Sequence, residues 1–154
     1  MERIVIKFVE RPNLNDQEKM IKWFCEVFGL SSEENPDSIE EQILRNFTEA
    51  AYRNKGLGSS ELKLETELAR STVIYHLNRF IDAGLLVKRG RKYYLRASEM
   101  SKAIEEIEYD INREMQRMLD MAKEFDRLME SSMSKRSSKP IKGESYGKRR
   151  AKIK

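Results

Sequence analysis

The sequence predicts a mainly α-helical fold of the α+β class. Apolar residues recur at the three- and four-residue spacing of amphipathic helices along most of the chain before Ser131. Strand-like patterns are confined to two short stretches, Arg3–Val9 and Leu85–Arg96. From Ser98 to Ser131 the chain contains neither Gly nor Pro, which favours one long helix.

Composition indicates one small domain with appendages. The chain has 154 residues, of which 39% are hydrophobic and 36% are charged, and the charged share exceeds that of an average globular domain. No apolar run approaches the ~20 residues of a membrane span, and the first residues lack the pattern of a signal peptide. We therefore expect a cytoplasmic protein without a membrane partner.

Residue types that carry catalysis or bind metals are scarce. Cys25 is the single cysteine and His76 the single histidine, which argues against an internal disulfide and against a cluster of metal ligands. No paired carboxylates, glycine-rich phosphate loop or nucleophile–base pair stands out. We expect neither an enzyme nor a bound cofactor or metal, and we expect Cys25 to lie in the core beside Trp23 and Phe24.

Charge is distributed unevenly between the body of the chain and its C-terminal end. Residues 135–154 contain nine basic residues and one acid, which leaves 21 basic and 25 acidic residues in the rest. The body is therefore mildly acidic and the end strongly basic. A basic tail suits a polyanionic partner, and it also suits a solvated segment with no partner.

The N-terminal residues 1–35 are predicted to form a strand followed by a helix. Arg3–Val9 alternates β-branched and polar residues. Asn15 with Glu18 three residues later predicts the start of the helix, and Gly29 predicts its end. The apolar face of this helix is expected to contain Met20, Ile21, Phe24, Cys25 and Phe28.

A second helix is predicted from Ser38 to about Arg53. Ser38 and Glu41 have the spacing of a capping box. The glycines of the segment 54–58 predict a turn after the helix. The apolar stripe is expected to consist of Ile39, Ile43, Phe47, Ala50 and Ala51.

The segment from Ser59 to Arg96 is predicted to fold as helix, turn, helix and hairpin. A short helix starts at Ser59–Glu61 and includes Leu62, and the chain breaks near Thr66–Leu68. The next helix covers 70–83, with Val73, Leu77 and Phe80 on its buried side and Gly84 after it. Two strand-like runs follow at Leu85–Arg89 and Lys92–Arg96, joined by Gly90-Arg91, a pair suited to a type II′ turn. This is the order of a winged helix–turn–helix, which we assign to residues 36–97 as a DNA-binding domain.

The side chains left on the outer face of helix 70–83 are donors and flat rings, which suit base edges and phosphates in a major groove. The hairpin at 86–96 adds cations suited to the backbone or the minor groove. For His76 the alternative is a side chain held by packing beside Leu77. The predicted DNA-binding residues are Arg70, Ser71, Thr72, Tyr75, His76, Arg79, Lys88, Arg89, Arg91 and Lys92.

The sequence Ser71-Thr72-Val73-Ile74-Tyr75-His76-Leu77, followed by Ala83-Gly84-Leu85-Leu86-Val87 and by Tyr93-Tyr94-Leu95, resembles the ArsR-like winged-helix transcription regulators of bacteria and archaea. That family has Ser-x-x-Val-x-x-His-Leu or a close variant, then Ala-Gly-Leu-Val, and a wing that ends Tyr-x-Leu. The resemblance implies a DNA-binding regulator. The chain departs from the family at Ala69, where Ser or Thr is usual, and at Lys63, Thr66 and Glu67. The metal-sensing clusters of the family are absent, so metal sensing is not implied.

The stretch 98–131 is predicted to be a long amphipathic helix of coiled-coil type. Apolar residues occupy nearly every a and d position of a heptad repeat, with Glu114 as the interruption. We expect this helix to form a homodimer, and the alternative is packing against the chain's own N-terminal helices. The predicted dimerisation residues are Met100, Ile104, Ile107, Ile111, Met118, Met121, Phe125 and Leu128. Residues 132–154 are expected to be a disordered basic tail.

The sequence thus favours a homodimeric, sequence-specific transcription regulator that binds double-stranded DNA. Two other classes stay open. One is a winged-helix module for protein–protein contacts, which would need no cations at the hairpin tip. The other is an RNA- or ribosome-associated protein that binds through its basic tail. The sequence gives no operator, no direction of regulation and no small-molecule effector.

Overall fold

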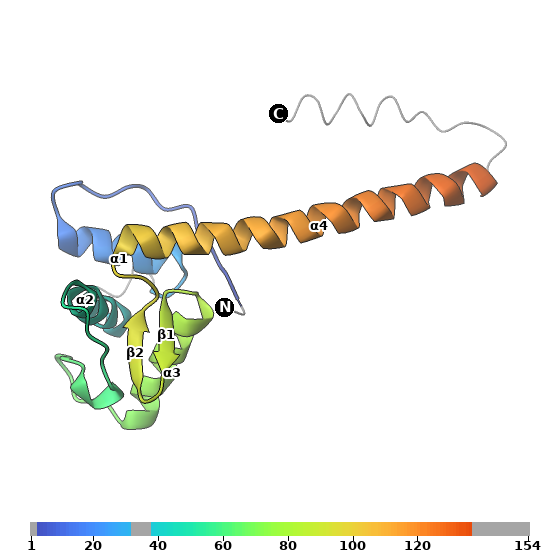
Figure 1. Ribbon diagram of the computed structural model, residues 1–154. Coiled ribbons are helices and arrows are strands. Elements are labelled where there is room, and N and C mark those ends of the chain that lie inside the picture. The colour runs from blue at the N-terminus through green and yellow to red at the C-terminus, as the bar shows by residue number, and fades with distance from the viewer. Residues whose placement is uncertain (1–2, 32–37, 137–154) are drawn as a thin grey trace. The chain divides into compact units, whose positions relative to one another are not determined.

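The computed structural model describes residues 3–31 and 38–136 (Figure 1). The described chain is mainly helical with one two-stranded antiparallel sheet, as the predicted fold class requires. It divides into two compact units, Met1–Tyr109 and Asp110–Lys154, and the boundary falls within the last helix, α4 (Met100–Arg136). Among the described helices none combines the length and the apolarity that a bilayer span requires.

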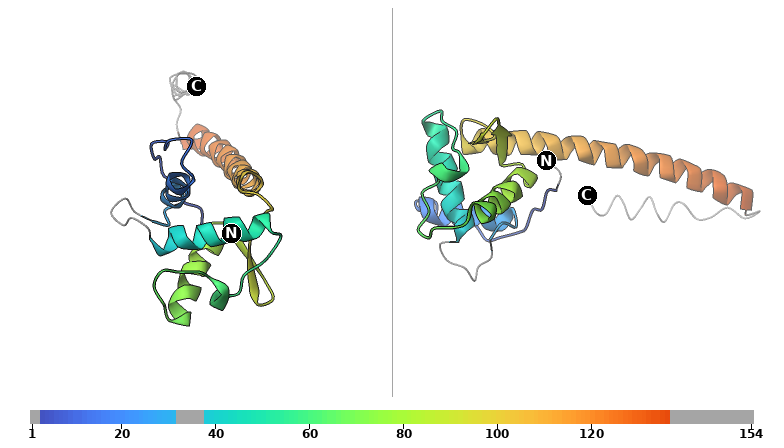
Figure 2. Two further views of the ribbon diagram at one scale, coloured as in Figure 1. Left: turned by 90° about the vertical axis from the view of Figure 1, so that its left-hand side faces the viewer. Right: turned by 90° about the horizontal axis from the view of Figure 1, so that it is seen from below.

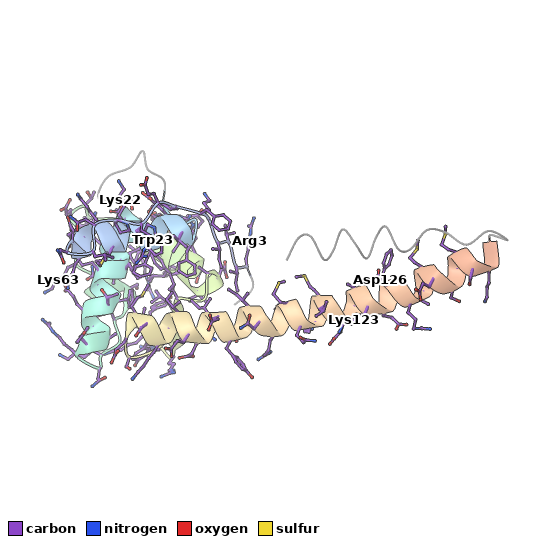
Figure 3. The ribbon with its side chains drawn as sticks, turned by 90° about the horizontal axis from the view of Figure 1, so that it is seen from above. Arg3, Lys22, Trp23, Lys63, Lys123 and Asp126 are labelled. Atoms are coloured by element: carbon purple, nitrogen blue, oxygen red, sulfur yellow. The ribbon has the colours of Figure 1, made fainter. Side chains whose placement is uncertain are left out.

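The predicted N-terminal strand is wrong. Residues 3–13 have no regular secondary structure and pair with no strand in the described chain. The Lys7 N–H donates to the carbonyl of Val27 at 2.7 Å. Nε1 of Trp23, a side chain labelled in Figure 3, donates to the carbonyl of Val9 at 3.1 Å. Both bonds join this segment to helix α1 (Gln17–Val27). The alternating pattern therefore marks an extended segment that is bonded to a helix and not to a sheet.

Helix α1 begins at a different cap from the predicted one. Asp16 is the N-cap, and its Oδ1 accepts a hydrogen bond from the Lys19 N–H at 3.2 Å. Asn15, the predicted cap, lies in the preceding turn, where its N–H donates to Asn13 Oδ1. The predicted stop is correct, since Gly29 has a φ of +68° just beyond the helix.

Helix α2 (Ile39–Tyr52) starts as predicted and forms the centre of the first unit. The Glu41 N–H donates to Ser38 Oγ, and the Ser38 N–H donates to Glu41 Oε2, each at 3.3 Å. This reciprocal bonding is the capping box that the sequence indicated. The helix contacts α1, the next helix α3 (Arg70–Asp82) and the hairpin, and Figure 2 shows it between α1 and α3. Its buried apolar residues are Ile43, Leu44, Phe47 and Ala50.

The predicted short helix containing Leu62 is wrong. One turn of 3₁₀ helix, η1 (Ser59–Glu61), is present, and residues 62–69 are not helical. Side chains of α2 form hydrogen bonds with the backbone N–H and C=O groups of this segment. Asn46 accepts from the Lys63 N–H at 2.9 Å and donates to the Lys63 carbonyl at 3.0 Å, and Gln42 accepts from the Glu65 N–H at 2.8 Å. These bonds replace the internal bonds of a helix.

Helix α3 and the hairpin follow the sequence prediction closely. Val73, Leu77 and Phe80 are buried, and α3 ends one residue before the predicted limit. Strands β1 (Leu86–Arg89) and β2 (Lys92–Leu95) pair antiparallel, with Gly90 at a φ of +63° in the turn. Leu57 also exchanges two backbone hydrogen bonds of 2.8 Å with Tyr93, which attaches the turn after α2 to the hairpin.

Gly56 in this turn permits the close approach of the hairpin. A Cβ atom at this position would overlap the Cε2 and Cζ atoms of the Tyr94 ring. We expect Gly56→Ala to lower the free energy of unfolding by about 1–3 kcal/mol, since either the ring or the backbone must move. Urea denaturation of the variant measures the change.

Gly58 provides the matched control for this substitution. A Cβ atom there would lie 3.2 Å from the end of the flexible Glu61 side chain, so Gly58→Ala is expected to be clearly milder. Replacing Tyr94 by Leu in the Gly56→Ala background should recover part of the loss. Equal losses for the two glycine variants would show that ring overlap is not the cause.

Helix α4 extends to Arg136, beyond the predicted end at Ser131. Its first turns belong to the first unit, where Ala103 and Ile107 are buried. Ile107 is only 2% exposed, so its predicted role in dimerisation is wrong, because its side chain is covered by its own chain. This part of the helix therefore packs on its own chain, and the predicted alternative of packing against the N-terminal helices stays a prediction. The predicted tail lies outside the described residues from 137 onward.

Candidate nucleic-acid interface

The exposed face of α3 carries part of the predicted set of polar side chains. Arg70, Ser71 and Tyr75 are exposed and Thr72 is half-buried. These residues belong to the first half of the helix. At 3.6 residues per turn Ser71 and Tyr75 lie opposite the buried Val73, whereas Arg70 lies on the same side as Val73. The phenol and the hydroxyls can donate and accept hydrogen bonds, and the guanidinium donates only.

Two residues predicted to face outward instead face the chain's own interior. Arg79 Nη1 donates to Glu40 Oε1 at 2.7 Å, and its Nη2 donates to the Gly29 carbonyl at 3.2 Å. His76 Nδ1 lies 2.9 Å from the same Glu40 oxygen. The side chains of Glu40, His76 and Arg79 are 9%, 17% and 33% exposed. Their predicted outward orientation is therefore wrong, and the alternative of a packed His76 agrees with the structure.

The three side chains join separate parts of the first unit. Glu40 lies in the first turn of α2, where a carboxylate also interacts favourably with the helix dipole. Arg79 and His76 lie on α3, and Gly29 follows α1. The Glu40 carboxylate thus links α2 to two side chains of α3.

Cys25 lies close to this cluster and is fully buried. Burial raises the pKa of its thiol far above the usual value, and the carboxylates of Glu41, Glu40 and Glu26 raise it further, while Arg79 opposes them. The thiol is therefore protonated at neutral pH and lacks the thiolate character of a reactive cysteine. Its predicted place in the core is confirmed.

The hairpin tip carries four exposed cations on a small, ordered scaffold. The ammonium of Lys88 lies 5.4 Å from the centre of the Tyr93 ring, and the guanidinium of Arg89 lies 5.6 Å from the centre of the Tyr94 ring. Arg91 and Lys92 complete the set. Within residues 3–31 and 38–136 none of the four forms an ion pair, so their charges are available to an external anion.

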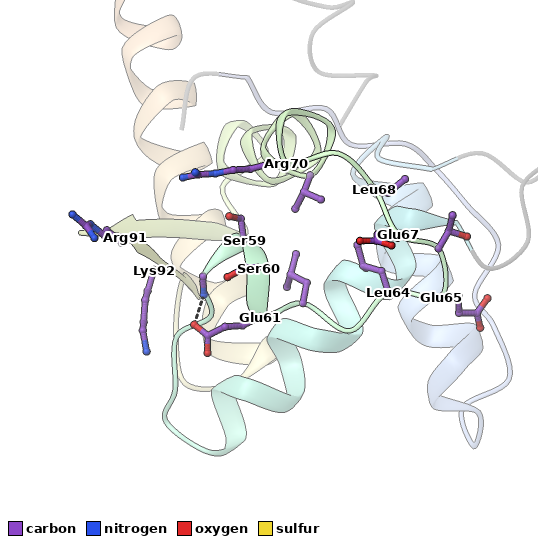
Figure 4. A pocket seen from close by; sticks show the side chains of 14 residues that line it. Ser59, Ser60, Glu61, Leu64, Glu65, Glu67, Leu68, Arg70, Arg91 and Lys92 are labelled. Carbon is purple, nitrogen blue, oxygen red and sulfur yellow. Dashed lines mark hydrogen bonds between the residues drawn. The ribbon is translucent and has the colours of Figure 1, made fainter.

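An open groove of about 830 Å³ lies between the N-terminal end of α3, the segment 58–68 and the hairpin. Figure 4 shows Arg70 and Arg91 extending toward the same side of this groove, with Lys92 next to Arg91. Glu65 and Glu67 lie at its opposite end. The groove thus has its cations at one end and two of its acids at the other, while a third acid, Glu61, lies near Lys92 and accepts a hydrogen bond from the Gly58 N–H at 2.9 Å.

Local structure adds to the positive potential at the cationic side. The first turn of α3 has no acidic residue, and its N-cap Ala69 makes no side-chain hydrogen bond. The N-terminal amide groups therefore keep their partial positive charge, which favours an anion near this end of the helix. Anionic groups of a polymer can bind here if they reach both α3 and the hairpin tip.

Sequence reasoning did not identify Ser59 and Ser60 as groove residues. They lie on η1 between Arg70 and Lys92 in the close view (Figure 4). Their hydroxyl groups can donate to an anion beside the cations. No local pattern predicts this position, because it depends on the pairing of Leu57 with the distant Tyr93.

Comparison of the chain with protein-family models, with curated proteins and with solved structures gives no match. The functional inference therefore rests on the groove and on the charges around it.

Proposed function

We propose that the chain is a winged helix–turn–helix transcription regulator that binds double-stranded DNA as a homodimer. The observation that supports this most is the shared groove: Arg70 of α3 and Arg91 and Lys92 of the hairpin line one open surface. A helix end and a cationic hairpin side by side suit the simultaneous contact of a groove and the adjacent backbone.

The order of elements supports the same assignment. Helix α2, the Leu57 pairing, η1, α3 and the hairpin follow one another as in a winged helix. The 3₁₀ turn and the segment after it take the place of the first helix of the helix–turn–helix. Their attachment to Gln42 and Asn46 holds them without helical bonds.

The proposal divides the contacts between two elements. On α3, Ser71, Thr72 and Tyr75 face base edges and Arg70 contacts a base or a neighbouring phosphate. The cations of the hairpin bind phosphates, and they fix the orientation of α3 on the duplex without reading sequence. His76 and Arg79 are positioning residues in this scheme, because both are directed at Glu40.

The basic experiment measures binding of the full chain to a random-sequence duplex by fluorescence anisotropy between ~50 and ~200 mM salt. The proposal expects binding that weakens steeply with salt. A chain ending at Arg136 should keep most of this affinity. Complete loss with the tail would favour the RNA- or ribosome-associated alternative, and no binding by either chain would favour a protein-binding module.

The variant Arg91→Ala tests the role of the hairpin tip. Loss of one phosphate contact should reduce the slope of log K against log salt by ~0.9 on every duplex sequence. Lys102→Ala removes an exposed cation outside the groove and should leave the slope unchanged. A variant Arg91→Ala with the slope of the unmodified protein would contradict the proposed contact.

A homodimer with two copies of α3 would recognise a pseudo-palindrome with half-sites ~34 Å apart or a multiple of that distance. Selection of bound sequences from a random duplex pool tests specificity and half-site spacing together. Enrichment of paired, inverted half-sites is the expected result. An unenriched pool would reduce the proposal to non-specific DNA binding.

A further inference from the structure

The second unit of the chain presents an exposed apolar face on α4. Beyond Tyr109 seven large apolar side chains of this helix are 44% to 71% exposed, while Ile111 and Met133 are half-buried. Figure 3 shows the side chains of α4, with Lys123 and Asp126 labelled among the polar ones. The exposed apolar residues are Met115, Met118, Leu119, Met121, Phe125, Leu128 and Met129.

The size of this face indicates a stable protein partner. Seven large side chains at these exposures, at roughly 200 Å² for a fully exposed side chain, present on the order of 700 Å². Soluble monomers rarely expose a contiguous apolar patch above ~300–600 Å². A standard interface buries ~800 Å² on each partner. One partner with an apolar face of similar size would therefore be enough to cover this face.

The apolar residues of this unit also fit a second heptad register, which shares Ile111, Met118 and Phe125 with the predicted one. The new register has an uninterrupted 4-3-4-3-4 spacing, which is typical of a coiled-coil seam. It leaves Glu114 outside the seam, where its carboxylate binds Arg117 of the same helix at 3.0 Å. The seam residues are Ile111, Met115, Met118, Ala122, Phe125 and Met129.

We propose that this seam binds the seam of a second copy in antiparallel orientation, with the two-fold axis at Asp120. The inference rests on the homodimer of the proposed function and does not depend on its DNA contact. In this arrangement the seam forms three kinds of layer, each of which occurs twice. The layers are Ile111 with Met129, Met115 with Phe125, and Met118 with Ala122 of the second copy.

The sizes of the seam residues favour the antiparallel orientation. Here the smallest residue, Ala122, meets Met118 of the second copy, and the largest, Phe125, meets Met115. In a parallel pair Ala122 would face Ala122 and Phe125 would face Phe125. One layer would then be underfilled and the next one crowded, and both defects are avoided when large and small residues alternate across an interface.

The residues beside the seam favour the same orientation. In the antiparallel pair Leu119 lies beside Leu119 of the second copy, and Met121 lies beside Met121. Both contacts are apolar and close to the axis. In a parallel pair Met121 would lie beside Asp126 and Glu114 beside Leu119, so two kinds of contact would place a carboxylate against an apolar side chain. The antiparallel pair has one such kind, Glu114 beside Leu128 of the second copy.

Disulfide trapping distinguishes the two orientations. The full-length variants Met115→Cys and Phe125→Cys are first oxidised separately. They are then co-expressed, with a size tag on one of them so that a mixed dimer can be identified, and oxidised together. An antiparallel pair separates identical positions by about ten residues, or ~15 Å along the helix, which a disulfide cannot bridge. The co-expressed pair should therefore form the disulfide and each variant alone should not. The unmodified protein is the control, since Cys25 is buried.

Self-linkage of each variant alone would overturn the antiparallel orientation. Sedimentation tests the dimer itself: Met118→Glu should weaken self-association by ~100-fold or more, since it buries a carboxylate in the seam. Gln116→Glu, an equal change at an exposed polar position, should not. A monomeric unmodified protein would overturn the inference, and salt-dependent duplex binding by that monomer would leave the proposed DNA contact standing.

Discussion

Replacing Glu40 by Gln is expected to lower the free energy of unfolding by about 2–3 kcal/mol. The substitution keeps the shape of the side chain and removes the buried charge that faces Arg79 and His76. Breaking a buried ion pair by neutralising one partner commonly costs ~3–5 kcal/mol. We reduce that figure because Arg79 is one-third exposed and water screens it. Urea denaturation followed by circular dichroism measures the loss.

Glu49 offers a control for this substitution on the same helix. It is an exposed glutamate of α2, and Glu49→Gln is expected to change the free energy of unfolding by less than ~0.5 kcal/mol. If Glu40→Gln were as mild as Glu49→Gln, the Glu40 carboxylate would not be what holds α3 in place. Arg79 and His76 would then not act as positioning residues for the proposed interface.

The combined replacement of Arg70, Arg91 and Lys92 by Ala is expected to abolish most duplex binding. Three lost phosphate contacts would lower the salt slope by ~2.7 and the affinity by about 500-fold at ~0.1 M salt. All three side chains are exposed, so the fold should be unaffected. Fluorescence anisotropy with a random-sequence duplex measures both quantities.

The charge-matched control removes three exposed cations that are not among the residues lining the groove, namely Lys19, Lys102 and Lys123. It changes the net charge by the same amount. The slope of log K against log salt should change by less than ~0.9, the value expected for the loss of one phosphate contact. Equal losses in the two triple variants would mean that duplex binding depends on net charge, and the groove would have no special role.

Local signals in the sequence predicted the inner face of α3 and the hairpin well. Val73, Leu77 and Phe80 recur at helical spacing, and Gly90 supplies the positive φ of the turn. These features depend on neighbours within a few residues of each other. The capping box at Ser38 was predictable for the same reason.

Features that depend on distant partners could not be predicted from the sequence. Arg79 looked like an outward cation because nothing in the sequence pairs it with Glu40, a residue of another helix. The segment after η1 looked helical because its bonds to Asn46 and Gln42 span about twenty positions. The extended N-terminal segment looked like a strand because alternation does not reveal whether a sheet edge exists.

The long helix shows both kinds of outcome. Its length and its apolar stripe follow from local spacing. The sequence could not predict which part of the apolar stripe is buried and which part is exposed. That depends on where the first unit covers the helix and buries Ala103 and Ile107. Only the part beyond Tyr109 keeps an exposed apolar face for a partner.

The most direct test of the proposed DNA interface is an NMR titration of the ¹⁵N-labelled full chain with a random-sequence duplex. The proposal predicts that the largest changes in amide chemical shift occur at Ser59–Ser60, Arg70–Tyr75 and Arg89–Lys92, which include residues of the groove, of the first half of α3 and of the hairpin tip. Shifts confined to residues 137–154, or shifts spread evenly over the exposed cations, would contradict it.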